Sequence, residues 1–279
     1  MSTTTDQSTP AVLKGANTSA YLPPTFDDPH KHRQWIKEHM AAGFRYLGAE
    51  SYGKEGVAGH VSVEDPVMPD CYWINPLMKH FTLMKASDLV LIDSAGQIVR
   101  GQGGNENAPI NTAAWSIHGA IHRLRPDVKA AVHCHSIAGK AWSTLCRPLD
   151  ITTQDSTVFY NDHAVYKDFG GVAFGQEEGV RIAEALGDKR ALILQNHGLL
   201  TCGQTVDEAV YLFGVMDRCC QVQIMADQAA ASLGVVTEKI RDEEAFETWK
   251  SIGTANANYL SFQPEFEVID VRSQGDFRL

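Results

Sequence analysis

The chain has 279 residues, 44% of them hydrophobic, which is enough for one large domain with a buried core. Its formal net charge of −10 argues against a nucleic-acid-binding or membrane-docking protein, because both need a basic face. No apolar run reaches the roughly 20 residues that span a bilayer, and the first residues lack the apolar core of a signal peptide. We therefore expect a cytoplasmic protein that has no nucleic-acid or membrane partner.

Composition divides the chain into three parts. Residues 1–29 are rich in Thr, Ser, Pro and Asp, which predicts a flexible N-terminal arm. Residues 30–262 carry the apolar periodicity of a single domain, and residues 263–279 are expected to form a C-terminal tail. The six cysteines have no C-x-x-C spacing, which indicates free thiols in a reducing compartment.

Helical and strand-like patterns alternate along the domain. A first helix is predicted over residues 30–42, where Gly43 would stop it. Strand patterns follow in VAGHVSVED, CYWINP and LVLIDSAGQIV, and the last of these suggests a hairpin at its SAG turn. Further helices are predicted over residues 110–125, 136–146, 177–186 and 205–231, with strands at 128–135 and on both sides of Asn196. This order predicts an α/β fold whose sheet is mixed or mostly antiparallel.

Two histidines stand two residues apart in VKAAVHCHS. Side chains alternate along a strand, so His133 and His135 would share a face while Cys134 points the other way. Two imidazoles about 6–7 Å apart can bind one divalent ion between them, each at ~2.1 Å. His197 is the best third ligand, because Gly198 permits close approach of the backbone. The alternative is that each is a core histidine bonded to a backbone carbonyl.

A second histidine pair lies upstream of this strand. His118 and His122 are four residues apart on the predicted helix and therefore share a face. Packing of the helix explains this pair at least as well as ligation does.

Several motifs together resemble the class II aldolase and adducin head-domain family. They are GHVSVEDP, WINP, SDLVLID, NTAAWSIHGAIHRLRPDVKAAVHCHS and LQNHGLLTCGQTVDEA, which cover about residues 30–260. The resemblance implies a three-layer fold with a central sheet flanked by helices, and a homotetramer with sites between subunits. It also implies that His133, His135 and His197 bind a divalent metal, most often zinc, with Fe(II), Mn or Co as alternatives.

The sequence departs from the aldolases of that family at the positions that move protons and hold phosphate. The acid/base glutamate falls at Ala114, so the chain resembles a divergent, fungal-type member that lacks this group. Thr112 stands at one phosphate-binding position, Asn75 begins the NPLM stretch that replaces a T-P-x-G turn, and His60 replaces a loop asparagine. A proton-donating tyrosine of the family falls at Gln154. His60, Asn75, Thr112 and Gln154 are therefore the candidate substrate-binding residues.

The three metal-binding histidines of the family are present, whereas its phosphate-binding and acid/base positions are replaced. This combination predicts a metal-dependent lyase of aldolase, decarboxylase or dehydratase type. Such an enzyme stabilises an enolate of a carbonyl substrate, here one without a phosphate group. Tyr160 and His163, in a polar segment after Gln154, are the leading candidates for the catalytic acid or base. Two alternatives remain: a non-haem Fe(II) oxygenase on an aromatic or secondary-metabolite substrate, and a non-catalytic, adducin-like interaction module.

Overall fold

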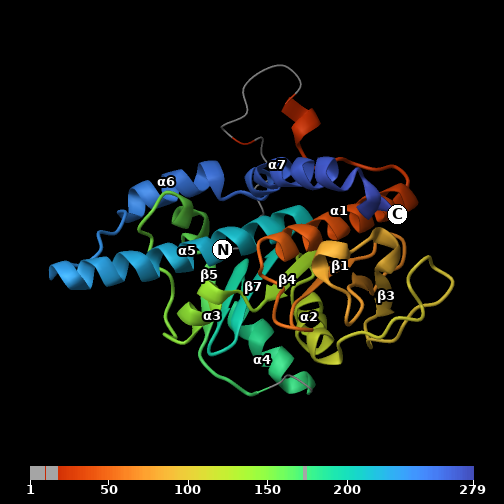
Figure 1. Ribbon diagram of the computed structural model, residues 1–279, viewed down its shortest axis with the longest axis horizontal. Helices are drawn as coiled ribbons and strands as arrows, with labels where there is room; N and C mark the ends of the chain where they lie inside the picture. The colour runs from red at the N-terminus through yellow and green to blue at the C-terminus, as the bar shows by residue number, and fades with distance from the viewer. Residues whose placement is uncertain (1–9, 11–17, 172–174) are drawn as a thin grey trace.

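A computed structural model describes residue 10, residues 18–171 and residues 175–279. The flexible arm expected over residues 1–29 lies mostly outside this part, and its described end contains a 3-10 helix, Thr18–Tyr21. The described chain is a seven-stranded sheet between helices, as the sequence predicts (Figure 1).

The sheet is antiparallel except at one edge. Its order is β3-β2-β1-β4-β7-β6-β5, and only β5 and β6 run parallel. The strands are β1 (His60–Glu64), β2 (Cys71–Ile74), β3 (Val90–Asp93), β4 (Ala130–Cys134), β5 (His163–Tyr166), β6 (Ala191–Leu194) and β7 (Gly198–Gly203). The hairpin expected in LVLIDSAGQIV is reduced to a single bridge between Ile92 and Ile98.

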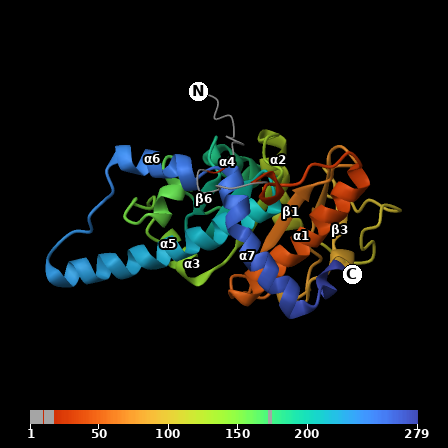
Figure 2. The ribbon, with the colours of Figure 1, turned by 90° about the horizontal axis from the view of Figure 1, so that it is seen from above.

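Helices cover both faces of the sheet. They are α1 (Pro29–Ala49), α2 (Thr112–Leu124), α3 (Ile137–Ser143), α4 (Gln176–Leu186), α5 (Val206–Leu233), α6 (Asp242–Ile252) and α7 (Ala255–Ser273). Figure 1 shows α1, α5 and α7 on one face, here called the α5 face, and α2 and α4 on the other, here called the α2 face. Seen from above, α5 extends beyond the sheet and the chain returns through α6 (Figure 2).

Alternate residues of β4 supply the two cores. Val132 and Cys134 belong to the large apolar cluster under α1 and α5, whereas Ala131 packs in the cluster under α2 and α4. His133 is two residues after Ala131 on the same strand, so its side chain also lies on the α2 face. The period-2 pattern thus places His133 on the face of the sheet that α2 and α4 cover.

Two boundaries differ from the sequence prediction. Helix α1 continues past Gly43 to Ala49. Gly43 allows close packing against α5 instead of ending the helix, since a Cβ there would lie 3.0 Å from Val210 Cγ2. The boundary expected at residue 262 falls inside α7, and Phe277 beyond it is fully buried against the body. At the start of α5, Thr205 caps the helix by accepting from the amide of Glu208, and the Glu208 carboxylate accepts from the amide of Gln204.

Candidate metal centre

Three histidines converge at the end of β4 and at the tight β6–β7 turn. The ring centroids of His133, His135 and His197 are 4.7–5.0 Å apart, and one nitrogen from each lies within 4.8 Å of the others. Asn196 adopts a positive φ of 56° in the turn and so directs the chain back, placing His197 beside the strand pair. Among the described residues, no other group of histidine, cysteine, aspartate and glutamate side chains has this geometry.

The hydrogen bonds of the triad leave nitrogens available for a cation. His133 donates from Nδ1 to the carbonyl of Leu199 at 2.8 Å, which fixes the tautomer and leaves Nε2 with a lone pair. Nε2 of His135 lies 3.1 Å from Nε2 of His133. Two imidazoles bound to one tetrahedral ion at ~2.1 Å would hold their nitrogens about 3.4 Å apart. These residues therefore fit a divalent metal with little adjustment.

Burial favours the neutral form of all three imidazoles. Burial, with a smaller contribution from His135, lowers the pKa of His197 to about 4. Burial and the neighbouring histidines hold the pKa of His133 well below its usual value, and burial followed by Lys140 lowers the pKa of His135. Because only neutral imidazole has a free lone pair, these shifts favour metal binding.

The triad opens onto a cavity of about 480 Å³ on the α2 face. Its wall includes Ala113, Ala114 and Ile117 of α2, together with Val57 and Phe169 from loops. Ala114 stands where the resemblance places the acid/base glutamate, and it presents a methyl group to this cavity. No described carboxylate lines the cavity, so any acid or base from this chain must be of another kind.

His60 is the predicted substrate-binding residue that the structure brings to the triad. It pairs with His133 across β1 and β4, and the two rings are 4.8 Å apart. Asn75 supports this strand from behind: its Oδ1 accepts from the amide of Val61, and its Nδ2 donates to the carbonyl of Gly59. Asn75 thus positions the wall of the cavity without lining it.

The other predicted residues are not among the described residues that line the cavity, although Thr112 stands between Asn111 and Ala113, which line it. Thr112 is an exposed residue at the start of α2, and Gln154 is exposed before the 3-10 helix Asp155–Phe159. His163 lies in β5 at the far edge of the sheet, where its Nε2 accepts from the Leu149 amide and its Nδ1 donates to the carbonyl of Phe159. Both nitrogens of His163 are therefore used to hold a loop.

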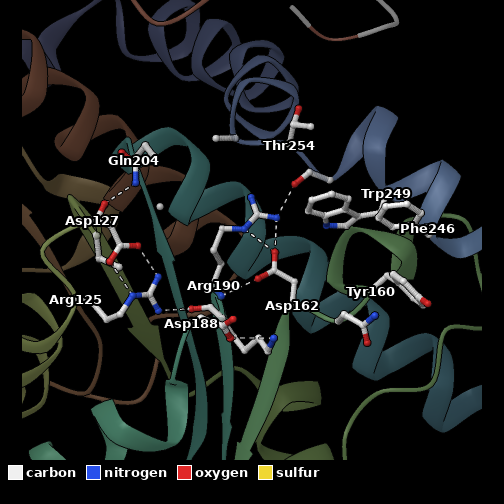
Figure 3. Close-up of a pocket in the computed structure, with 16 residues that line it drawn as sticks. Arg125, Asp127, Tyr160, Asp162, Asp188, Arg190, Gln204, Phe246, Trp249 and Thr254 are labelled. Atoms are coloured by element: carbon white, nitrogen blue, oxygen red, sulfur yellow. Dashed lines mark hydrogen bonds and ion pairs between the residues drawn. The ribbon is translucent and has the colours of Figure 1, made fainter. Parts of the chain in front are cut away.

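Tyr160 lines a second cavity, of about 210 Å³, which also lies apart from the triad. In Figure 3, Tyr160 stands on the same side of this pocket as Phe246 and Trp249 of α6. Arg190 occupies its base, ion-paired with Asp162 and Glu208 and donating to the carbonyl of Gly253. This arginine is fully engaged by the fold.

Sequence reasoning missed three polar residues that line the metal cavity, Asn111, Lys140 and Asn196. Asn111 caps α2 by accepting from the amides of Ala113 and Ala114, and it lines the cavity. Lys140 also lines it and forms an ion pair with Glu55 at 2.5 Å. The position of Lys140, five residues after His135 and on the helix that follows the strand, was the available signal. Trp73, Phe81 and Phe159, which lie near the same sequence motifs, belong to the large apolar core.

Comparison with known proteins gives a family model and close relatives. The model of the Class II Aldolase and Adducin N-terminal domain matches residues 38–224. The chain is 38% identical over 246 residues to the decarboxylase NovR of Streptomyces niveus, covering 88% of this chain and 87% of that protein. It is 37% identical over 252 residues to 4-hydroxy-3-prenylphenylpyruvate oxygenase/4-hydroxy-3-prenylbenzoate synthase of Streptomyces roseochromogenus subsp. oscitans, covering 90% and 87%.

Solved structures have the same fold. L-fuculose 1-phosphate aldolase from Glaciozyma antarctica PI12 superimposes with a TM-score of 0.84 at 40% sequence identity, covering 94% of this chain and 98% of that one. No helix in the described chain is both long and apolar enough to cross a membrane.

Proposed function

Because the chain belongs to the class II aldolase and adducin family, we propose that it is a metal-dependent, lyase-type enzyme acting on a non-phosphorylated carbonyl substrate. The observation that carries this proposal is the triad of His133, His135 and His197, whose free nitrogens converge at the wall of a cavity. Relatives named for decarboxylase and aldolase activity support a lyase.

The triad would hold a divalent ion, for which we propose zinc, with Fe(II), Mn or Co as alternatives that imidazole ligands also accept. Such an ion supplies positive charge for the carbonyl oxygen and so favours bond cleavage that leaves an enolate. The protein's own contribution is to hold three neutral imidazoles in place, His133 through its bond to Leu199, and to surround the reacting groups with the apolar side chains of Ile117 and Phe169.

The walls of the cavity favour a substrate without a phosphate group. Lys140 is the only cationic side chain among the described residues that line it, and Glu55 already neutralises that charge in part. Ala113 and Ala114 offer no hydroxyl group at the start of α2. A phosphate dianion needs several donors for its oxygens, whereas a neutral hydroxy carbonyl compound needs few.

A cleavage assay with paired substrates tests this function. The protein would be purified with zinc and offered hydroxy ketones, keto acids and hydroxy acids, each beside its phosphorylated counterpart where one exists. We expect turnover of a member of the non-phosphorylated set without oxygen consumption. A preference for the phosphorylated members, or no difference between wild type and His133→Ala, would contradict the proposal. His30→Ala is the matched control, because His30 is exposed at the start of α1.

The second candidate is a non-haem iron oxygenase, which the name of one relative favours. It requires Fe(II) at the same triad and consumption of O2 with turnover. Parallel anaerobic and aerobic assays separate the two chemistries. An adducin-like, non-catalytic module would bind no metal tightly, so a complete triad speaks against it.

We also propose that the protein is a cytoplasmic homotetramer. The family resemblance supports the tetramer, and six cysteines without C-x-x-C spacing support a reducing compartment. Light scattering coupled to size-exclusion chromatography would give a mass near four times 30.6 kDa, and a monomer would contradict it.

A further inference from the structure

Behind the metal cavity, four buried polar side chains form a continuous hydrogen-bonded file between β1 and α2. Nδ1 of His60 lies 2.7 Å from Nε2 of His118, whose Nδ1 lies 2.6 Å from Oγ of Ser62. The same hydroxyl lies 2.7 Å from Nε2 of His122, and Nδ1 of His122 lies 3.3 Å from the carbonyl of Val128. We call His60, His118, Ser62 and His122 the histidine file.

The last contact fixes the direction of every hydrogen bond in the file. A carbonyl oxygen can only accept, so Nδ1 of His122 carries its proton and Nε2 of His122 must accept. The Ser62 hydroxyl therefore donates to His122 and accepts from Nδ1 of His118.

The same reasoning continues to the cavity. With its proton on Nδ1, neutral His118 has a lone pair on Nε2 and accepts from Nδ1 of His60. Neutral His60 then has its only proton on Nδ1, and its Nε2 carries a lone pair. One proton arrangement thus satisfies all four bonds.

The surroundings keep the file neutral. Ser62 and His118 are fully buried, and no carboxylate among the described residues forms a hydrogen bond to any member. Burial lowers the pKa of His122 to about 4 and holds the pKa of His118 well below its usual value. An added proton would therefore be a buried charge without a counterion.

His60 is the end of the file that reaches the cavity. Its side chain lines the cavity, its Nδ1 is taken by His118, and its Nε2 forms no hydrogen bond to the described residues. Nε2 also lies outside the metal-ligand group, which comprises His133, His135 and His197 alone in the described chain. It is thus an acceptor aimed at whatever occupies the space beside the triad.

We propose that the histidine file fixes His60 as a hydrogen-bond acceptor for a substrate hydroxyl group, with His118, Ser62 and His122 as positioning residues. This inference rests on the proposed function, and it narrows the substrate class to carbonyl compounds with a free hydroxyl close to the carbonyl. A hydroxyl is the donor that fits, because an ammonium group would be repelled by the cation of the triad. A compound whose hydroxyl is methylated would leave Nε2 unpaired.

The tautomers can be measured directly in metal-free protein. Two-bond 1H–15N correlation spectra of 15N-histidine-labelled chain distinguish Nδ1–H from Nε2–H imidazole, with assignment by single substitution. We expect the Nδ1–H form for His60, His118 and His122 near pH 7.5, although free histidine favours Nε2–H in water. An Nε2–H or doubly protonated His60 would overturn the proposal.

The role in recognition is tested with two small probes on zinc-loaded protein. Hydroxyacetone and methoxyacetone differ at the hydroxyl, and their dissociation constants can be measured by chemical-shift titration. We expect wild type to prefer hydroxyacetone by about three- to tenfold. Ser62→Ala breaks the file away from the cavity and should bring the two constants close together. Ser116→Ala, which removes a hydroxyl elsewhere on α2, should leave the preference unchanged. Equal constants in wild type would overturn the proposal.

Metal content measured on the same samples distinguishes a failure of the histidine-file proposal from a failure of the proposed lyase function. If wild type binds zinc but shows the wrong tautomer, the histidine file is refuted while the proposed lyase stands. If wild type binds no metal, the proposed function fails, and the tautomer spectrum still decides the state of the file. If His60→Phe loses the metal along with the triad variants, His60 is a ligand and our assignment of it as an acceptor is wrong.

Discussion

The metal triad and His163 are both histidine sites on the same sheet, but they differ in what their nitrogens contact. His163 gives one nitrogen to a backbone amide and the other to a carbonyl, so it is a structural crosslink. His197 forms no side-chain hydrogen bond among the described residues, and His135 meets only His133. Burial lowers the pKa values of all of them, so the pKa shift does not distinguish the two kinds of site. What distinguishes the metal triad from His163 is that the triad has ring nitrogens without a hydrogen-bond partner among the described residues.

Removing a triad member should have the largest effect. His197→Ala deletes one of three ligands, and we expect zinc affinity to fall on the order of 1,000-fold, about 4 kcal/mol. Because the side chain of His197 forms no hydrogen bond to the described residues, the metal-free variant should unfold at nearly the wild-type urea concentration. Competition with a fluorescent chelator measures the affinity. If this variant bound zinc as tightly as wild type, His197 would not be a metal ligand, and the contrast between the triad and His163 would be wrong.

His163→Ala should give the opposite result. It leaves the amide of Leu149 and the carbonyl of Phe159 without their partner, which costs about 3 kcal/mol of unfolding free energy. Zinc content should not change, because the residue lies at the far edge of the sheet. Urea denaturation and metal analysis on one preparation give both numbers. A loss of zinc without a loss of stability would show that His163 belongs to the active site.

The buried file makes the fold sensitive to acid. The pKa of His122 is about 4 in the folded state against about 6.5 for an unfolded histidine, so the unfolded chain binds the proton first. Its contribution is therefore complete above about pH 6.5 and declines as the pH falls toward 4. We expect it to remove about 2 kcal/mol of unfolding free energy between pH 7 and pH 5.

The comparison of wild type with His122→Gln isolates that contribution from the carboxylates. Urea titrations of the metal-free proteins at several pH values should show a shallower decline in the variant. Parallel curves would mean that His122 is not the group responsible.

The smallest effect is expected at Lys140. Its ion pair with Glu55 is partly exposed, so Lys140→Gln should change the unfolding free energy by less than about 0.5 kcal/mol. Burial is the main cause of the low pKa of His135 and Lys140 the second, so the variant should raise that pKa slightly. An NMR titration of the metal-free protein would detect the shift, and a decrease would contradict the electrostatic account.

The metal ligands could be predicted from sequence because the relevant geometry is local. Period-2 alternation puts His133 and His135 on one face, and Gly198 marks a turn where His197 can approach. The sheet and its mixed character followed from the same patterns. The absence of a carboxylate at Ala114 could also be read from the residue alone, and the cavity wall agrees with it.

The remaining site residues depend on which elements pack together. The contact of His60 with His118 requires the register of β1 on β4 and the packing of α2 on both, and no local pattern encodes these. Tyr160 and His163 are candidates for the catalytic acid or base in the sequence only because their segment is polar. That polarity indicates exposure or hydrogen bonding but gives no direction. His163 lies in the edge strand β5, two strands from β7, and Tyr160 lines a different cavity.

Metal stoichiometry of the isolated protein tests the central claim most directly. Samples purified with and without oxygen would be analysed by plasma mass spectrometry before and after dialysis against zinc. We predict close to one divalent ion per chain in wild type and in His163→Ala, and almost none in His197→Ala. A wild-type protein that binds no zinc, manganese, cobalt or iron at micromolar concentration would contradict the account.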